Sequence, residues 1–419
     1  MPDIAIISAI YPPEPQVSAR MAHDLANHLA KQGHRVTVLC PQPSRPLNAD
    51  YNQYQNKPFM VETVEGTVRV VRLPSFAAPQ SRLFSRLRES FSFGLHAISF
   101  LKKLSTQPDV VYMNSWPIAS QAMIAAYARR RAIPLVMQIM DLYPESLTEK
   151  LPTFAGLLVN WPLRKLDTWV ASSAYKVIVI SEAMRSIFIR SRRVATEKII
   201  TIPTWQDDAL FVNVASRQEC CKKYGVPEQP FTFMYLGNIG PVAGVDFLIR
   251  CFAEAALPDA QLIIAGDGTT KIFCQELAKQ LKLANVYFIS DPDVKNVPLL
   301  QVMADVCMLP MKRGTGTSSI PSKLPAYMFS GKPVIATVDA DSDTARSVVN
   351  AACGWVGPAE DVGWMIKTMR DVANLPVKQL EDVGQRGKSY GLTHFSKSSG
   401  VTRLAQTVIN NLSTKQDHT

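Results

Sequence analysis

Short apolar runs alternate with stretches of helical periodicity along most of the chain. In the first half, the runs that predict strands are Ile4–Ser8, Arg35–Cys40, Val110–Asn114, Leu135–Ile139, Val177–Ile180 and Ile199–Ile202. In the second half, they are Phe231–Leu236, Gln261–Ala265, Asn285–Ile289, Val306–Leu309 and Pro333–Val338. Near-continuous apolar strands separated by helices are typical of a parallel sheet covered on both faces. The pattern therefore predicts an α/β protein.

The alternation is interrupted once, between Thr204 and Pro230, where the sequence becomes polar. Two doubly wound, Rossmann-like units in series are the simplest account, with ligand at the carboxyl ends of the strands. We predict a first domain over residues 1–205 and a second over residues 206–394. Phe395–Leu412 has the pattern of an amphipathic helix, and we expect the segment 395–419 to pack back onto the first domain.

Composition narrows the class of protein. Of the 419 residues, 47% are apolar and 19% are charged, as in a globular enzyme. The net charge of +10 favours anionic lipid or phosphate-bearing substrates as partners. Nucleic acid ranks last, because no basic run carries the interleaved aromatic residues of a nucleic-acid module.

The sequence also bears on the cellular compartment. No apolar run reaches the length of about 18 residues that a spanning helix needs, and the first residues have a strand pattern rather than that of a signal peptide. The seven cysteines are scattered without metal-ligand spacing, mostly in apolar segments, which is typical of buried thiols in a cytosolic protein. We therefore expect a cytoplasmic protein.

The most informative segment runs from residue 314 to residue 345. A Gly/Ser/Thr loop that contains Ser318 and Ser319 leads into a short helix with Lys323, then a Gly-Lys-Pro turn and a strand. Backbone N–H groups at loop ends and helix starts make a concave site for phosphate oxygens, and Lys323 adds a point charge. This arrangement predicts a site for the diphosphate of a nucleotide sugar.

Two further glycine-bearing turns follow strands of the second half. Their candidate ligand contacts are Gly237, Asn238 and Gly240 after the first strand, and Gly266 and Asp267 after the second. Each turn allows close approach of backbone to a ligand, and each is equally well explained as an ordinary strand–helix turn, with Asp267 as a cap. The glycine spacing is not that of a dinucleotide fingerprint.

The acids Asp339 and Asp341 are open to two interpretations. They resemble the Asp-x-Asp pair with which many sugar-nucleotide enzymes hold a divalent cation. Asp341 and Ser342 are also good N-caps for a helix that starts near Asp343, which requires no metal. We favour the capping interpretation and expect no metal or other cofactor.

In the first half, polar residues follow strands that would end at the same sheet edge. Ser18 and Arg20 come after the first strand and a proline-rich loop, and Trp116 follows the strand that ends at Asn114. We predict that these three residues line an acceptor cleft, and for Trp116 a place in the core is the alternative that the sequence leaves open. Asp141 and Glu145 follow another strand, and either acid is a candidate base or a group that orients an acceptor hydroxyl.

A further helix is predicted before residue 104. Its apolar stripe is Leu83, Phe84, Leu87, Phe91, Leu95, Ile98 and Leu101, and its basic flanks are Arg82, Arg86, Arg88, Lys102 and Lys103. Such a stripe is more often core than membrane contact. The flanking cations keep a surface helix on anionic lipid as the alternative.

Taken together, these residues resemble the two-domain (GT-B) glycosyltransferases of the large retaining family 4, in the branch of colanic acid and O-antigen synthesis. The matching motifs, in chain order, are Tyr-Pro-Pro-Glu from Tyr11, Gly-His-Arg-Val from Gly33, Asp-Leu-Tyr-Pro-Glu from Asp141, Gly-Asn-Ile-Gly from Gly237 with Gly244, Pro-Ser-Lys-Leu from Pro321, Gly-Lys-Pro-Val-Ile-Ala from Gly331, and Phe-Ser from Phe395. The resemblance implies a nucleotide-sugar donor bound by the second domain and an acceptor, lipid-linked, bound by the first. It also implies retention of configuration without an essential metal.

The chain departs from that family pattern at the donor side. Ser318 and Ala326 stand where many members carry a pair of glutamates, and the second of these often holds the ribose. Asn238 and Ala243 stand where an arginine and a lysine are usual. These departures leave Lys323, or Lys312 and Arg313, to meet the diphosphate.

We therefore predict a glycosyltransferase at the inner face of the plasma membrane. Three alternatives remain open at this stage. The first is a catalytically weakened partner subunit with the same fold, the second is another GT-B enzyme such as a sugar-nucleotide epimerase, and the third is an NAD-linked oxidoreductase.

Overall fold

The computed structural model describes two compact units. The first comprises Met1–Thr204 together with Gly400–Thr419, and the second is Trp205–Ser399. The described residues are 1–45, 51, 60–64, 68–76, 83–114, 118–143, 153–291, 293–315 and 320–413.

The first unit is built on one sheet, which contains eight strands among the described residues, in the order β3-β4-β2-β1-β5-β6-β7-β8. Every neighbouring pair is parallel except β3 with β4, which is antiparallel. The strands are β1 (Asp3–Ser8), β2 (Arg35–Pro41), β3 (Met60–Val64), β4 (Val68–Leu73), β5 (Val110–Asn114), β6 (Leu135–Ile139), β7 (Lys176–Val179) and β8 (Ile199–Thr201).

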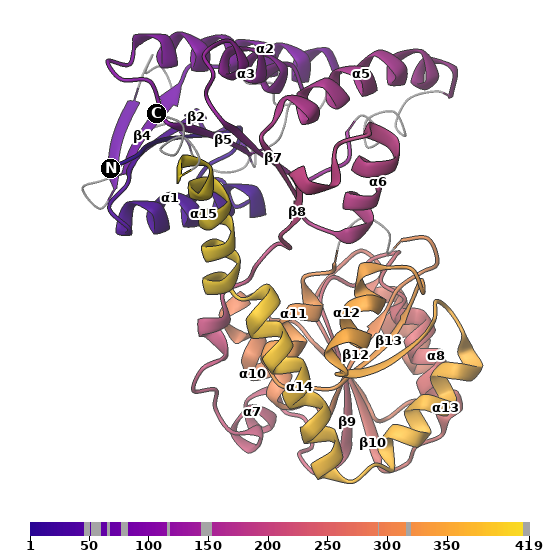
Figure 1. Ribbon diagram of the computed structural model, residues 1–419. Coiled ribbons are helices and arrows are strands. Elements are labelled where there is room, and N and C mark those ends of the chain that lie inside the picture. Colours follow the sequence, from indigo (N-terminus) through magenta and orange to yellow (C-terminus); the bar gives the residue numbers. More distant parts are fainter. Residues whose placement is uncertain are drawn as a thin grey trace. The chain divides into compact units, whose positions relative to one another are not determined.

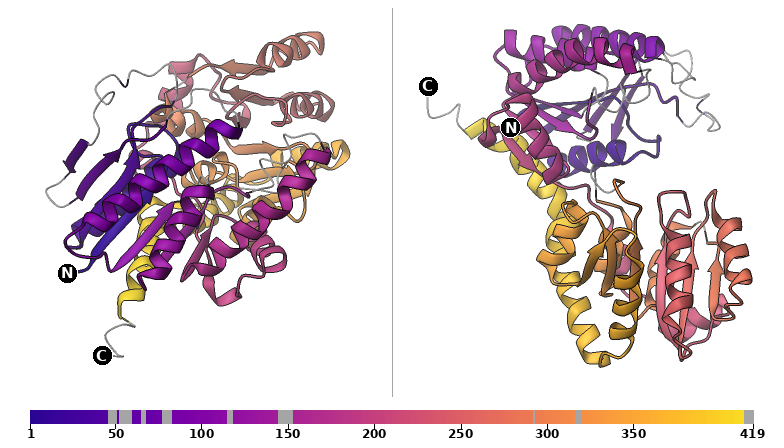
Figure 2. Two further views of the ribbon diagram at one scale, coloured as in Figure 1. Left: turned by 90° about the horizontal axis from the view of Figure 1, so that it is seen from above. Right: turned by 90° about the vertical axis from the view of Figure 1, so that its right-hand side faces the viewer.

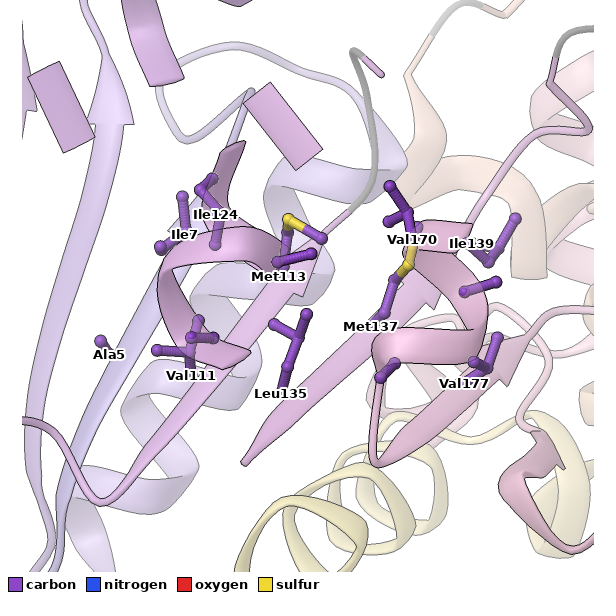
Figure 3. Packing of buried hydrophobic residues seen from close by; sticks show 14 of the residues in the cluster. Ala5, Ile7, Val111, Met113, Ile124, Leu135, Met137, Ile139, Val170 and Val177 are labelled. Carbon is purple, nitrogen blue, oxygen red and sulfur yellow. The ribbon is translucent and has the colours of Figure 1, made fainter. Parts of the chain in front are cut away.

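Helices cover both faces of this sheet, as the sequence pattern predicts. The helices are α1 (Val17–Lys31), α2 (Leu83–Lys103), α3 (Ile118–Arg130), α5 (Thr153–Ser173), α6 (Glu182–Arg192) and α15 (Lys397–Ser413). Figure 1 shows α2, α3 and α5 over one face and α1 over the other. Alternate strand residues such as Ile7, Val111 and Met137 pack against Ile124 of α3 and Val170 of α5 in one apolar core (Figure 3).

The second unit contains a six-stranded sheet within its described residues, in the order β11-β10-β9-β12-β13-β14, and all pairs are parallel. Its strands are β9 (Phe231–Leu236), β10 (Ala260–Ala265), β11 (Val286–Ile289), β12 (Val306–Pro310), β13 (Val334–Val338) and β14 (Gly354–Pro358). The chain builds the sheet outward from β9 in one direction and from β12 in the other. The switch point, where ligands of open parallel sheets bind, therefore lies between β9 and β12.

Two layers of helices cover this second sheet (Figure 2). One core joins the sheet to α8 (Val245–Ala255), α9 (Lys271–Gln280) and α13 (Val362–Ala373). The core on the other face includes residues of α7 (Arg217–Tyr224), α10 (Val297–Val302), α11 (Lys323–Phe329), α12 (Asp343–Ala351) and α14 (Val377–Phe395). The predicted α/β class with two Rossmann-like sheets is confirmed.

Several predicted details differ from the structure. The strands β3, β4 and β14 were not predicted, because β4 carries two arginines and β14 contains two glycines. The helix predicted from Phe395 begins at Lys397, since Phe395 ends α14 and Ser396 adopts an extended conformation between the two helices. The hydroxyl of Ser396 accepts a hydrogen bond from the N–H of Ser399 at 3.2 Å, which fixes the start of the last helix.

The prediction of which residues form the buried face of α2 was only partly correct. The helix packs on α3 through a face that contains Phe93, Ala97 and Leu101, whereas Phe91 and Leu95 of the predicted stripe are 54% and 48% exposed. None of the helices in the described part of the chain has the length and apolar character needed to span a lipid bilayer.

Candidate functional site

Most of the predicted donor-side residues come together at one edge of the second unit. They follow the carboxyl ends of neighbouring parallel strands, namely β9, β10, β12 and β13. The residues are Gly237, Asn238 and Gly240 after β9, Gly266 and Asp267 after β10, Arg313 after β12, Lys323 at the start of α11, and Ser342 after β13. This edge includes the switch point between β9 and β12, so the chain gathers these residues where a ligand is expected.

Lys323 is held against the end of β9. Its Nζ donates a hydrogen bond to the hydroxyl of Tyr235 at 2.8 Å and lies 4.2 Å from the centre of the Tyr235 ring. Burial lowers the pKa of Lys323 from 10.5 to about 8. The ammonium is therefore placed on an aromatic face, where it is less well solvated than in water.

Helix α11 contacts the end of β9 at a second point, one turn further on. The hydroxyl of Tyr327 accepts a hydrogen bond from the N–H of Leu236 at 3.0 Å and lies 3.2 Å from the carbonyl oxygens of Leu236 and Met308. Lys323 and Tyr327 are four residues apart and so share one helical face. That face fixes the helix to the ends of both central strands.

The glycines after β9 and β10 bring two loops together. A Cβ atom on Gly266 would lie 2.0 Å from the carbonyl oxygen of Gly237, and one on Gly268 would lie 2.3 Å from that of Ile239. The N–H of Ile239 also donates to the carbonyl oxygen of Asp267 at 2.9 Å. Gly266 and Gly268 are thus required by the contact between loops, and any role of Gly266 in ligand binding stays a prediction.

Two other predicted residues beside these loops are accessible. The carboxylate of Asp267 accepts a hydrogen bond from Nζ of Lys271 at 2.7 Å, and this bond lowers the pKa of Asp267. Asn238 is exposed, and its side chain lies next to buried Gly240. The charge of Asp267 is therefore matched by the first lysine of the helix that follows it, while Asn238 is exposed to solvent.

The acids after β13 support the capping interpretation. Both carboxylate oxygens of Asp339 accept from the N–H of Gly314, at 2.9 and 3.2 Å, which ties this acid to the loop after β12. Ser342 caps α12 by accepting from the N–H of Ala345 at 3.1 Å. In the described part of the chain, no group of three or more His, Cys, Asp or Glu side chains is placed to hold a metal ion.

The backbone of Arg313, in the loop after β12, is held by a residue that follows β14. Its N–H donates to the carboxylate of Glu360 at 3.2 Å, and the residue is exposed. Ser318, Ser319, Trp116 and Glu145 lie outside the described residues, so their predicted roles are not addressed by the structure.

In the first unit, the predicted acceptor-side residues lie after β1 and β6. The carbonyl of Ser18 accepts a hydrogen bond from the side-chain amide of Asn114 at 2.8 Å, which joins the first turn of α1 to the end of β5. Arg20 is exposed on α1, and Asp141 is exposed directly after β6. The roles of these three residues in acceptor binding remain predictions.

Sequence reasoning missed Glu14 as an organiser of the same sheet edge. Its buried carboxylate accepts hydrogen bonds from the N–H groups of Ser44 and Arg45 at 3.1 and 3.0 Å. Burial raises the pKa of Glu14, and these two N–H groups oppose the rise. Glu14 therefore joins the loop after β1 to the loop after β2. The signal in the sequence was the Tyr-Pro-Pro-Glu motif that ends at Glu14, from which no role for the acid was inferred.

A cavity of about 450 Å³ lies at the opposite, amino edge of the second sheet, beside Phe231 and Pro333. Its wall includes Arg217, which forms an ion pair with Asp305 at 2.7 Å and binds the Thr232 hydroxyl at 3.0 Å. These contacts tie α7 to the starts of β9 and β12. The cavity is separate from the residues predicted to bind a donor.

Comparison with known protein families gives two matches, one in each half of the chain. Residues 18–205 match the model of the family described as "Glycosyl transferase 4-like domain". Residues 216–390 match the model described as "Glycosyl transferases group 1".

Individual similarities include one relative in sequence and two solved structures of similar fold. WcaI of Escherichia coli (strain K12), whose name assigns it to colanic acid biosynthesis as a glycosyl transferase, is 25% identical over 82% of this chain and 85% of its own. A glycosyltransferase from Rickettsia africae ESF-5 has a similar fold, with a TM-score of 0.70, 13% identity and 98% of each chain covered. HepE of Anabaena, solved in complex with UDP-glucose, gives a TM-score of 0.63 at 16% identity and covers 98% of this chain and 100% of its own.

Proposed function

The chain belongs to the two-domain glycosyltransferases in which a glycosyl transferase 4-like domain precedes a group 1 domain, and from this premise we propose its reaction and substrates. The protein transfers a sugar from a nucleotide-diphosphate sugar to a glycan acceptor during the synthesis of a cell-surface polysaccharide. The name of WcaI, which refers to colanic acid biosynthesis, supports this class of product. The acceptor that we propose is lipid-linked.

The observation that carries the donor assignment is the position of Lys323. Its ammonium lies at the carboxyl edge of the second sheet, against a phenol and beside the backbone of Gly237. Within the described residues, no ion pair with a carboxylate involves this lysine. A partly buried cation without a carboxylate partner is well suited to attract the diphosphate of a donor.

We propose a front-face displacement that retains the configuration of the transferred sugar. The acceptor oxygen forms a bond to the anomeric carbon while the bond from that carbon to the diphosphate oxygen breaks. The acceptor proton passes to the departing phosphate, so no strong protein base is needed. Lys323 stabilises the charge that develops on the diphosphate, and Asp141 or Glu145 orients the acceptor hydroxyl.

This mechanism requires no metal ion. Stabilisation of the leaving group is assigned to the ammonium of Lys323 and to backbone N–H groups at the sheet edge. The engagement of Asp339 with Gly314 and of Ser342 with Ala345 supports a structural role for the acidic segment after β13.

A screen of nucleotide sugars tests the proposed function. The full chain is incubated with UDP-, GDP- and ADP-sugars, with and without a membrane extract that contains lipid-linked acceptors, and release of nucleoside diphosphate is measured. We expect turnover with one donor and an increase when acceptor is present. Absence of turnover with every donor, together with absence of nucleoside diphosphate binding, would exclude the donor assignment.

The departures at Ser318 and Ala326 favour one alternative, a partner subunit with weakened catalysis. Ala326 is buried within α11, so its side chain offers no polar contact to a ribose. Such a protein would bind nucleoside diphosphate but release none from a nucleotide sugar when assayed alone. The same screen therefore separates the two functions.

We further propose that the first unit docks on the anionic, cytoplasmic face of the plasma membrane. On its surface, Phe91 and Leu95 of α2 are 54% and 48% exposed, and Trp161 of α5 is 65% exposed. Cations accompany exposed aromatic rings, since Lys165 Nζ lies 3.8 Å from the Trp161 ring centre. The guanidinium carbon of Arg88 likewise lies 4.2 Å from the centre of the Phe76 ring. Aromatic side chains beside cations suit the interface of an anionic bilayer.

Replacing Phe91 and Leu95 together with serine is expected to weaken binding to vesicles that contain anionic lipid by about tenfold or more, because two apolar side chains lose burial in the bilayer. Co-sedimentation with vesicles measures the effect. Val349→Ser, at a residue 65% exposed on α12, is the matched control and should bind like the wild type. Equal binding by the double variant would contradict docking through α2.

A further inference from the structure

We propose that Tyr235 is a positioning residue that holds the ammonium of Lys323 at the end of β9, facing the site of the donor diphosphate. This inference rests on the proposed function, because it assigns to Tyr235 the task of presenting the cation that the donor meets. Tyr235 does not itself touch the substrate in this proposal.

The hydrogen-bond pattern fixes the direction of each contact. A lysine ammonium has only donors, so the phenol oxygen must accept from Lys323 over the 2.8 Å between them. The single phenol hydrogen is then directed to the carbonyl oxygen of Asn238, at 2.6 Å. Tyr235 is fully buried, which leaves its hydroxyl little freedom to turn away from Lys323.

The backbone next to the phenol leaves room for the lysine head group. A Cβ atom on Gly237 would lie 3.3 Å from Cε and 3.5 Å from Nζ of Lys323. Gly237 also has a φ of +148°, which disfavours larger residues. Tyr235 and Gly237 thus form the binding position of the ammonium. The ring of Tyr235 lies against the ammonium, and Gly237 has no side chain that would displace it.

The titratable groups near Lys323 explain why Tyr235 is expected to affect the pKa of this lysine. From β9 the titratable neighbour is Tyr235, and from its own helix α11 it is Tyr327, whose hydroxyl is already bound to strand backbone. Within the described residues, no carboxylate forms an ion pair with the lysine. Burial lowers the pKa of Lys323 to about 8. The phenol oxygen accepts a hydrogen bond from the ammonium at 2.8 Å, and a hydrogen bond to the charged form of a group favours that form.

The sign of the pH dependence follows. As pH rises through about 8, Lys323 loses its proton, and the attraction of the site for a diphosphate falls. Removing the phenol oxygen withdraws an acceptor from the ammonium, which lowers the pKa of Lys323 further. The loss of donor affinity should then occur at lower pH in Tyr235→Phe than in the wild type.

The test uses the full chain and the nucleoside diphosphate, among UDP, GDP and ADP, that raises the melting temperature of the wild type most. Its affinity is measured by calorimetry between about pH 7 and about pH 9. We expect Tyr235→Phe to bind the nucleoside diphosphate roughly tenfold more weakly near neutral pH. The pH at which its affinity falls on the alkaline side should be lower than in the wild type by roughly one unit. Lys323→Ala should bind weakly and show no such loss.

Tyr287→Phe, on the edge strand β11 of the same sheet, is the matched control and should behave as the wild type. A second readout needs no ligand, namely the pH dependence of acetylation at Lys323. We expect a midpoint near 8 in the wild type and a lower one in Tyr235→Phe. An unchanged midpoint in Tyr235→Phe would overturn the role of Tyr235, even if no nucleotide bound. If the acetylation midpoint shifts but the wild type binds no nucleoside diphosphate, Tyr235 holds the lysine and the donor assignment is wrong.

Discussion

Replacing Lys323 with alanine is expected to lower kcat/KM for the donor by about 10- to 100-fold. The estimate corresponds to the loss of a hydrogen bond to a charged group, about 1.5–3 kcal/mol. Because the ammonium is assigned to the diphosphate, which gains charge as the bond breaks, the reduction should include kcat as well as KM. Release of nucleoside diphosphate from the donor measures both constants.

The same substitution should not lower the stability of the folded protein. Burial depresses the pKa of Lys323 from 10.5 to about 8, so the unfolded chain binds the proton more tightly than the folded protein does. The charged lysine therefore opposes folding below about pH 8, and this cost disappears as pH rises toward 10.5. Removing it near neutral pH should not lower the melting temperature.

Lys279→Ala is the matched control, since this lysine of α9 is 73% exposed and pairs with Glu276. It should retain the kinetic constants of the wild type. If Lys323→Ala also retained them, the lysine would have no part in donor binding, and the proposed site would lose its main support.

Replacing Asp167 with alanine is expected to destabilise the first unit by about 3–5 kcal/mol. The carboxylate of Asp167 accepts from Nε of Arg192 at 3.0 Å, and the two side chains are only 4% and 1% exposed. Arg192 also donates to the carbonyl oxygen of Tyr143 at 2.9 Å. Without Asp167, a buried guanidinium between α5 and α6 would lose its counter-ion.

Urea unfolding followed by circular dichroism measures this effect. Asp371→Ala provides the comparison, because Asp371 pairs with Lys367 on an exposed helix face, with side chains 60% and 76% exposed. Exposed pairs contribute about 1 kcal/mol or less. A loss of similar size in both variants would show that the buried pair contributes no more than a surface pair.

The sequence was sufficient to predict most strands and the two-sheet architecture. Central parallel strands are buried on both faces, so their residues are apolar in nearly every position and can be recognised locally. Strand β4 escapes this logic because Arg72 is buried within it. One terminal nitrogen of its guanidinium donates to the carbonyl oxygen of Pro12, 60 residues away, and no local pattern reveals such a partner.

The candidate site was predictable to a similar extent. The loop and lysine order placed Lys323 at the sheet edge, because the carboxyl ends of parallel strands must meet there. The importance of Tyr235 was not predictable, since its contact with Lys323 spans 88 residues of sequence. Gly266 was predicted to face a ligand or to form an ordinary turn, and the structure shows that it accommodates the carbonyl of Gly237.

The assignment of residues 400–419 to the first unit has a consequence for biosynthesis. Leu404 and Val408 of α15 are fully buried, and the guanidinium of Arg403 donates to the carbonyl oxygen of Thr201 at 2.9 Å. The ribosome synthesises the whole of Trp205–Ser399 before it reaches residues 400–419. The apolar surface of the first unit that α15 covers in the folded protein therefore stays exposed until the carboxyl-terminal half has been translated. Chaperone capture of nascent chains should concentrate in that interval.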